Sequence, residues 1–314
     1  MEKEKVIKTK SAILPYDEPL THRRMLEYIN IFAERYKCFH ISFLGNSLMN
    51  KSIPVITLGK GKKRVLYIGA HHGMEWITTA LLLKFANEYC ELFDSNGHIG
   101  HTSISYLNST RSIVLIPMLN PDGVDYQING VSESNPLFER LVKMNYGSED
   151  FSCWQANGRG VDLNHNYDAG FYEYLRCDET QKLSNGAPTK WCGNSPESEP
   201  ESGLAANFCR FNDDIGLFIS FHSQGEEIYY GDKYCPPIEN KRIGKMLERM
   251  SGYKLMETSG SASSGGFTDW IVKELRKPAY TIECGKGVNP LPTSNLFEIY
   301  FKLRRMLFEA PMII

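Results

Sequence analysis

The sequence predicts an α/β fold in which helices cover both faces of a mixed, mostly parallel sheet. Short apolar runs typical of buried strands alternate with longer stretches whose apolar residues recur at helical spacing. No internal repeat, low-complexity tract or linker interrupts this alternation. A length of 314 residues suits one large domain of this class. We expect residues 1–15 to be an N-terminal lead-in and residues 16–314 to form a single domain.

The first half of the chain supplies most of the expected sheet. Residues 22–37 carry an apolar stripe at helical spacing, including Met25, Ile29 and Phe32, and this stripe predicts a helix. Apolar or alternating runs predict strands at 39–44 and 53–58. A buried strand at 64–70 ends in a bend rich in Gly and His, a helix over 76–92 follows, and another strand at 112–117 leads to the turn Asn120-Pro-Asp-Gly.

The second half begins with a segment of a different composition. Gly, Asn and Tyr are frequent between residues 127 and 197, which predicts long loops with short helices. Regular patterns then return and predict strands at 215–222 and 279–283, with helices at 202–212, 240–251, 268–275 and 295–308.

Composition limits the classes of partner that we expect. The formal net charge is −2, which is too small to indicate nucleic acid or an anionic membrane surface. The first ten residues carry charges where a secretory signal would need an apolar core. No stretch approaches the roughly 20 apolar residues of a membrane-spanning helix. We therefore expect a cytoplasmic protein with no nucleic-acid or membrane partner, unless a leader has been removed.

The eight cysteines form no C-x-x-C pair, which argues against a structural zinc cluster. In a reducing compartment each would be a small buried hydrophobic residue or an inert thiol. Cys153, Cys177 and Cys192 all fall in the loop-rich segment. A disulfide among these three is an open alternative if the protein is exported.

Residues that could bind a metal follow the predicted strands. A catalytic zinc takes three protein ligands and keeps one position for water. His72-Gly-Met-Glu75 follows the strand at 64–70, and His222 ends the strand at 215–222. Glu283 ends a third strand, and in such sheets the site lies at the carboxyl ends of the strands. Spacing alone leaves His71 open as the ligand instead of His72, since His71-x-x-x-Glu75 would suit one face of a helix.

Six motifs, in the same order, resemble those of the M14 metallocarboxypeptidase family from about residue 16 to residue 311. The resemblance implies a three-layer α/β/α domain with a central mixed sheet of about eight strands. It also implies one Zn²⁺ ion on His72, Glu75 and His222, and so selects His72 over His71. The motifs are His72-Gly-Met-Glu75-Trp76, Asn120-Pro-Asp-Gly123, Gly160-Val-Asp162-Leu-Asn164-His165-Asn166, His222 after an apolar strand, Gly265-Gly-Phe-Thr268-Asp-Trp270 and Tyr280-Thr-Ile-Glu283.

The same resemblance implies catalytic roles for residues outside the metal set. Glu283 would be the general base and acid, since a carboxylate beside zinc-bound water can take its proton at neutral pH. Arg159 would stabilise the oxyanion, although a surface arginine on a loop is the alternative. Asp162 would orient the ring of a ligand histidine, although it could equally be a turn residue.

Departures from the digestive carboxypeptidases affect the expected substrate. Those enzymes hold the substrate's terminal carboxylate with an Asn-Arg pair, and here the pair reads Asn164-His165. A histidine neither forms a bidentate fork nor stays charged at pH 7. A tyrosine and an arginine of those enzymes are likewise replaced, by Ser261 and Met74.

The segments 154–166 and 221–230 resemble the bacterial γ-D-glutamyl-L-diamino acid endopeptidases. This resemblance implies a peptide substrate of the muropeptide class, cut between γ-D-glutamate and meso-diaminopimelate or L-lysine. Thr268 stands at the position of the family's specificity pocket, and Gln224 and Glu226 are candidate contacts to the diamino acid. Both could instead be ordinary loop residues. A general carboxypeptidase, an inactive peptide-binding protein and a deacylase on the same scaffold are the competing interpretations.

Overall fold

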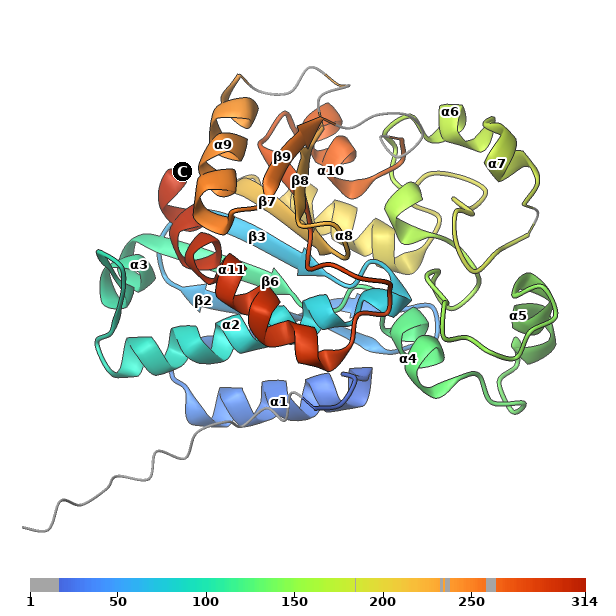
Figure 1. Ribbon diagram of the computed structural model, residues 1–314, viewed down its shortest axis with the longest axis horizontal. Helices are drawn as coiled ribbons and strands as arrows, with labels where there is room; N and C mark the ends of the chain where they lie inside the picture. Colours follow the sequence, from blue (N-terminus) through green and yellow to red (C-terminus); the bar gives the residue numbers. More distant parts are fainter. Residues whose placement is uncertain (1–16, 184, 232–233, 235–237, 258–263) are drawn as a thin grey trace, which may run out of the picture.

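The computed structural model describes residues 17–183, 185–231, 234, 238–257 and 264–314. The expected lead-in at 1–15 and the replacement at Ser261 lie outside these residues. Figure 1 displays a central sheet with helices packed on its two faces, which confirms the predicted α/β/α class. No described helix is long and apolar enough to cross a membrane.

The sheet has eight strands in the order β1-β2-β6-β3-β7-β10-β8-β9. The pairs β6–β3, β3–β7, β7–β10 and β8–β9 are parallel, whereas β1–β2, β2–β6 and β10–β8 are antiparallel. The sheet is therefore mixed and mostly parallel, as predicted. Its strands are β1 Phe39–Asn46, β2 Ser52–Gly59, β3 Lys63–Gly69, β6 Arg111–Ile116, β7 Ile215–His222, β8 Glu227–Tyr230, β9 Lys254–Glu257 and β10 Ala279–Glu283, and a separate two-stranded ribbon comprises β4 His98–Ile99 and β5 Thr102–Ser103.

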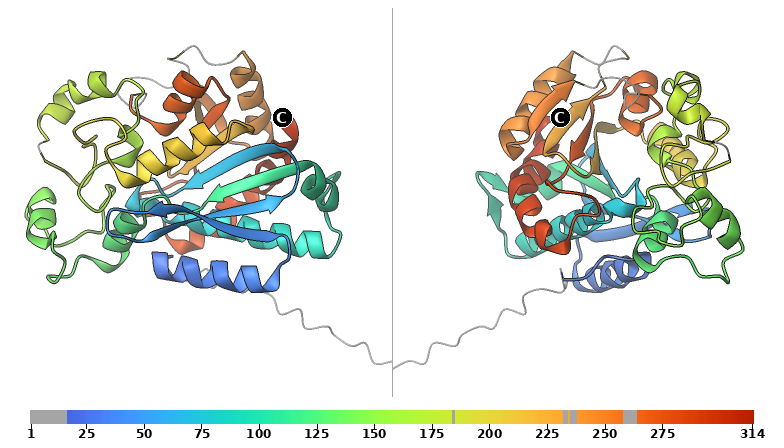
Figure 2. Two further views of the ribbon diagram at one scale, coloured as in Figure 1. Left: turned by 180° about the vertical axis from the view of Figure 1, so that it is seen from behind. Right: turned by 45° about the vertical axis from the view of Figure 1, so that its right-hand side comes forward.

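The longer helices form the outer layers of the fold. Figures 1 and 2 place α1, α2, α9 and α11 against one face of the sheet and α8 with α10 against the other. These helices are α1 His22–Arg35, α2 Ile77–Asp94, α8 Pro200–Phe211, α9 Glu239–Ser251, α10 Phe267–Trp270 and α11 Leu296–Glu309, with a π-helical turn Ile271–Leu275 after α10. The shorter elements are α3 Ile104–Thr110, α4 Pro121–Asn129, α5 Phe138–Met144, α6 Phe171–Leu175, α7 Asp178–Gln181 and 3₁₀ turns at Gly73–Glu75, Leu163–His165, Thr293–Asn295 and Ala310–Ile313.

Alternation along β3 divides the core into two layers. Val65 and Tyr67 pack in the cluster under α1, α2, α9 and α11, whereas Leu66 and Ile68 pack in the cluster under α8 and α10. Successive side chains of a strand point to opposite faces, so a strand buried on both faces reads as a continuous apolar run. This is why β3, β6 and β7 could be located from the sequence.

The segment between α4 and α8 has the predicted character of long loops with short helices. It lies at the right side of Figure 1, beside the ends of the central strands. Cys153, Cys177 and Cys192 are free thiols there, so the structure contains no disulfide among them.

Candidate active site

Three parallel strands deliver the predicted site residues to one edge of the sheet. Gly69 at the end of β3 pairs with Phe221 of β7, and His222 at the end of β7 pairs with Glu283 at the end of β10. The chain leaves β3 through Ala70, whose φ is +48°, and enters the turn that carries His72. Sheet register thus brings together residues that are far apart in sequence.

The turn after β3 is held in place by backbone contacts. A Cβ on Gly73 would lie 2.4 Å from the carbonyl oxygen of Gly123 and 2.8 Å from that of Trp154, so only glycine fits there. The Gly73 N–H donates to the carbonyl oxygen of Gln155 at 2.8 Å. The buried Asn120 amide donates to the carbonyl oxygens of His71 and Ala156. The motif at residues 120–123 therefore joins the metal-binding turn to the loop segment.

His72, Glu75 and His222 are buried and lie within 4.8 Å of one another. The Nδ1 atoms of the two histidines are 3.3 Å apart, and each lies close to a different oxygen of Glu75, at 3.0 and 2.9 Å. Donors at about 2.0–2.1 Å from a tetrahedral zinc would be separated by roughly 3.3 Å, so this donor set fits the ion. Burial raises the pKa of Glu75, but His72 and His222 outweigh it and hold that pKa at about 2. Among the described residues, these three form the one group placed to hold a zinc ion.

Residues around the zinc ligands fix their rings. Asp162 Oδ1 lies 3.1 Å from His72 Nε2, the distance expected of an acceptor that orients a ligand imidazole. His71 does not join the metal cluster. Its ring nitrogens instead lie 3.2 Å from the hydroxyls of Ser220 and Tyr167. The choice of His72 over His71 is therefore confirmed, and the orienting role of Asp162 remains a prediction.

Glu283 lies at the edge of the metal cluster. Burial, together with the nearby carboxylates of Glu75 and Glu227, raises the pKa of its carboxyl to about 8, and His72 acts in the opposite direction. No hydrogen bond holds its side chain among the parts of the chain that the structure describes. A carboxyl group that is desolvated and free of fixed partners is suited to proton transfer.

A cavity of about 780 Å³ opens above the metal ligands and Glu283. Its described lining contains four acidic residues and no lysine or arginine. The predicted substrate-binding residues Asn164, His165, Thr268 and Gln224 all line it. The structure thus gathers most of the predicted site residues around one space, whereas His222, Arg159 and Asp162 are not part of its lining. The acidic residues are Glu75, Glu227, Asp269 and Glu283.

Asn164 and His165 occupy the place of the carboxylate-binding pair. Asn164 Oδ1 accepts from the N–H of Phe267 at 3.1 Å. His165 Nδ1 lies 2.8 Å from the Ser264 carbonyl oxygen, so Nδ1 carries the proton and donates. Burial lowers the pKa of His165, and its ring stacks on Tyr174 with centroids 4.0 Å apart. A lowered pKa favours the neutral imidazole at pH 7, which offers no positive charge to a carboxylate.

The remaining predicted contacts differ in their surroundings. The Thr268 hydroxyl lies 2.8 Å from that of Thr281, and both threonines line the cavity. Gln224 lines the cavity and accepts from the N–H of Gly287 at 3.2 Å. Glu226 is outside the cavity lining, since Lys302 and Lys286 hold its carboxylate.

Arg159 is not part of the lining of this cavity. Its guanidinium forms a two-pronged pair with buried Glu199, at 2.7 and 2.8 Å, and also donates to the carbonyl oxygen of Ser198. Gln155, which the sequence analysis did not single out, lines the cavity instead. Its Oε1 accepts a short hydrogen bond from Thr189, which leaves the amide N–H groups able to donate elsewhere.

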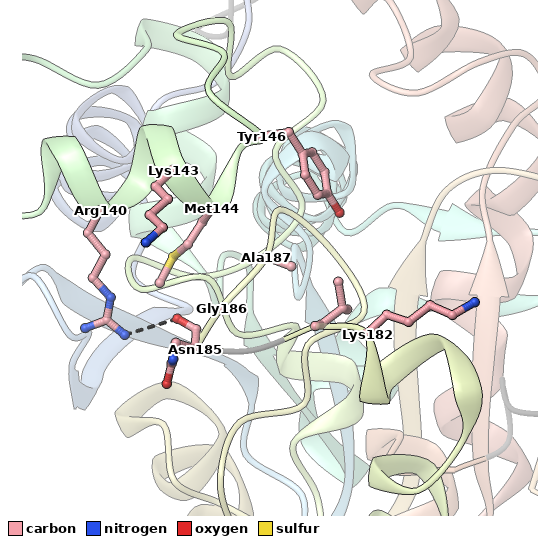
Figure 3. A pocket seen from close by; sticks show the side chains of 9 residues that line it. Arg140, Lys143, Met144, Tyr146, Lys182, Asn185, Gly186 and Ala187 are labelled. Carbon is pink, nitrogen blue, oxygen red and sulfur yellow. Dashed lines mark hydrogen bonds between the residues drawn. The ribbon is translucent and has the colours of Figure 1, made fainter.

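A second cavity lies in the loop segment and contains none of the predicted site residues. It has a volume of about 590 Å³ and is shown in Figure 3. Arg140 donates to the carbonyl oxygen of Asn185 at its rim, at 3.1 Å. Lys143 and Lys182 supply two further positive charges, and no acidic residue belongs to its described lining.

Comparisons with known proteins agree with this geometry. A family model described as zinc carboxypeptidase, peptidase M14, matches residues 25–300. The chain is 34% identical over 257 residues to gamma-D-glutamyl-L-diamino acid endopeptidase 1 of Lysinibacillus sphaericus, covering 82% of this chain and 63% of that protein. It is 33% identical over 298 residues to the uncharacterized protein YqgT of Bacillus subtilis, covering 94% and 77%. The fold is similar to that of bovine thrombin-activatable fibrinolysis inhibitor, with a TM-score of 0.72 at 20% identity and coverage of 95% and 98%. The chain thus spans less than two thirds of the length of the endopeptidase.

Proposed function

This chain belongs to the M14 zinc carboxypeptidase family, and from that premise we propose that it hydrolyses peptidoglycan stem peptides. The bond cut is the one between γ-D-glutamate and meso-diaminopimelate or L-lysine. One observation carries the proposal: the described lining of the catalytic cavity has no lysine or arginine, and a lowered pKa favours the neutral form of His165. A substrate whose cut residue continues into further amino acids needs no clamp for a terminal carboxylate. The similarity to the Lysinibacillus sphaericus endopeptidase supports the same substrate class.

The residues of the chain divide the chemistry among them. His72, Glu75 and His222 would hold a zinc ion, which lowers the pKa of bound water and polarises a carbonyl group. Glu283 accepts a proton from the attacking water and then donates one to the leaving amine of the diamino acid. Burial raises the pKa of Glu283, which favours the return of this proton to the leaving amine.

The negative charge that develops on the carbonyl oxygen also needs a donor from the protein. The family resemblance assigns this role to Arg159, and the assignment remains a prediction. Gln155 is a second candidate because its residue lines the cavity. Its backbone carbonyl oxygen accepts from the N–H of Gly73, which lies between the metal ligands His72 and Glu75, so Gln155 is close to the metal site.

Digestion of L-Ala-γ-D-Glu-meso-diaminopimelyl-D-Ala, in which the cut residue continues into a further amino acid, tests the proposal when followed by mass spectrometry. A blocked C-terminal dipeptide serves as the competing substrate, and each digestion is repeated with a chelator. We expect chelator-sensitive release of L-Ala-D-Glu. Cleavage of the dipeptide alone would identify a general carboxypeptidase. If zinc-loaded protein cuts neither substrate, the inactive peptide-binding interpretation replaces the proposed one.

A further inference from the structure

Two neighbouring glutamates at the start of β8 have different surroundings. Glu226 binds Lys302 at 2.5 Å and Lys286 at 3.3 Å, outside the catalytic cavity. Glu227 lines the cavity, and it forms no ion pair with any residue that the structure describes. Its side-chain hydrogen bond comes from the hydroxyl of Tyr229, which donates to Oε2 at 2.5 Å. Oε1 is therefore left for another donor.

Sheet register places Glu227 directly opposite the catalytic glutamate. In the antiparallel pair of β8 and β10, Glu227 faces Glu283, and residues opposite each other have Cβ atoms about 4.5–5.5 Å apart. Like charges at such positions are destabilising. Zinc on Glu75 reduces the negative charge at one end of the cavity but does not supply a partner for Glu227.

Glu227 is half-buried, so solvent only partly screens its charge. The Glu227 carboxylate lies beside that of Glu283 and has no cationic partner among the described residues. This arrangement indicates that the ligand supplies the cation. The hydroxyls of Thr268 and Thr281 line the same cavity and could accept from an ammonium group, whereas a carboxylate would find no lysine or arginine in the described lining.

We propose that Glu227 binds the side-chain ammonium of the residue whose amine leaves, and so selects a diamino acid at that position. Glu283 donates its proton to the α-amine of this residue, and Glu227 stands opposite Glu283 across one strand pair. Because Glu227 lies this close to Glu283, its carboxylate would contact the side chain of the residue whose α-amine receives the proton. This inference rests on the proposed function and names the residue that gives it its substrate preference.

The test measures a ratio of kcat/KM for two substrates that differ only in the ammonium group. L-Ala-γ-D-Glu-L-Lys-D-Ala carries the cation, and L-Ala-γ-D-Glu-L-norleucyl-D-Ala has the same side-chain carbons without it. We expect the wild-type protein to prefer the lysine substrate by roughly tenfold to a hundredfold, the range of a charge-assisted hydrogen bond. Glu227→Gln should lose most of this preference. Glu227→Asp should keep part of it, and the matched control Glu226→Gln should keep all of it.

Zinc content and thermal melting of each variant confirm that it is folded and metal-loaded. An equal wild-type rate on both substrates would overturn the role of Glu227 while leaving the proposed function intact. A loss of rate in Glu227→Gln that is the same for both substrates would also overturn it, since Glu227 would then act only on Glu283.

Failure of the proposed function is distinguished by a second pair of substrates. If no γ-D-glutamyl peptide is cut, the same ratio is measured on benzoyl-Gly-Lys and benzoyl-Gly-norleucine. A preference for lysine that Glu227→Gln abolishes would support the ammonium site with a different peptide substrate. A ratio that Glu227→Gln leaves unchanged would overturn the ammonium site as well.

Discussion

The catalytic cavity and the cavity of the loop segment differ in charge and in construction. The catalytic cavity stands on the ends of β7 and β10, and its described lining is acidic. The cavity of the loop segment is lined by α5 and by residues near α7, and its charged residues are all basic. Parallel strands fix the first set of side chains through sheet register. In this chain the residues expected to carry out the reaction thus lie where neighbouring strands determine their relative positions.

The largest expected effect is a loss of activity in the catalytic cavity without a loss of bound zinc. Glu283→Gln should lower kcat by about 10² to 10⁴, because a positioned proton donor and acceptor is lost. Zinc content should stay at the wild-type level, since none of the three ligands is changed. Steady-state kinetics together with metal analysis checks this expectation. Retained activity in this variant would end the assignment of Glu283.

The next prediction concerns the residue that donates a hydrogen bond to the oxyanion, which is either Gln155 in the cavity lining or Arg159 outside it. Gln155→Leu should lower kcat by about a hundredfold, the loss typical of one missing donor. Arg159→Gln should mainly lower the melting temperature, because buried Glu199 would lose its cation. Parallel measurements of kcat and melting temperature distinguish the two. A larger loss of kcat in Arg159→Gln would return the role to the arginine.

A buried acid on α8, outside the described lining of both cavities, gives a pH-dependent effect of a few degrees on the melting temperature. Burial raises the pKa of Glu201 from 4.5 to about 7, so the folded state binds this proton more tightly than the unfolded chain does. Its contribution to stability is greatest below about pH 4.5 and is lost as the pH rises to 7. Glu201→Gln cannot ionise. Its melting temperature relative to wild type should therefore be higher at pH 8 than at pH 5, and a constant difference would refute the pKa shift.

The smallest expected effect comes from the basic cavity. Replacing Lys143 and Lys182 together by serine should leave kcat/KM on the small stem peptide within about twofold of wild type, because surface charges away from a reaction contribute little. Kinetics on the small peptide tests this. A tenfold loss would show that the two cavities act as one binding surface.

Much of the fold could be predicted because buried parallel strands have a clear signature in the sequence. Six strands of the sheet were expected at nearly the residues where they lie. The strands β8 and β9 were not located, since each has only four residues and no long apolar run. Helix α8 begins two residues earlier than expected, where Pro200 occupies its first turn.

The metal ligands and Glu283 were predictable because they follow strands and match motifs. Gln155 and Glu227 were not, because each depends on a contact that only the folded chain creates. Glu227 had one usable signal. In β8, Ile228 and Tyr230 are buried while Glu227 and Tyr229 are half-buried, so recognition of this short alternating strand would have placed Glu227 on the cavity side.

The hydrogen bond from Gly73 to Gln155 couples metal binding to the order of the loop segment. Asp162 makes a second connection of this kind through His72. An ion that binds only the folded arrangement stabilises everything that must be in place for it to bind. A bound zinc ion would therefore stabilise the folded loop segment in addition to its role in catalysis. Its loss would loosen residues 154–162 toward local unfolding, and amide hydrogen exchange would record that change long before the sheet itself opens.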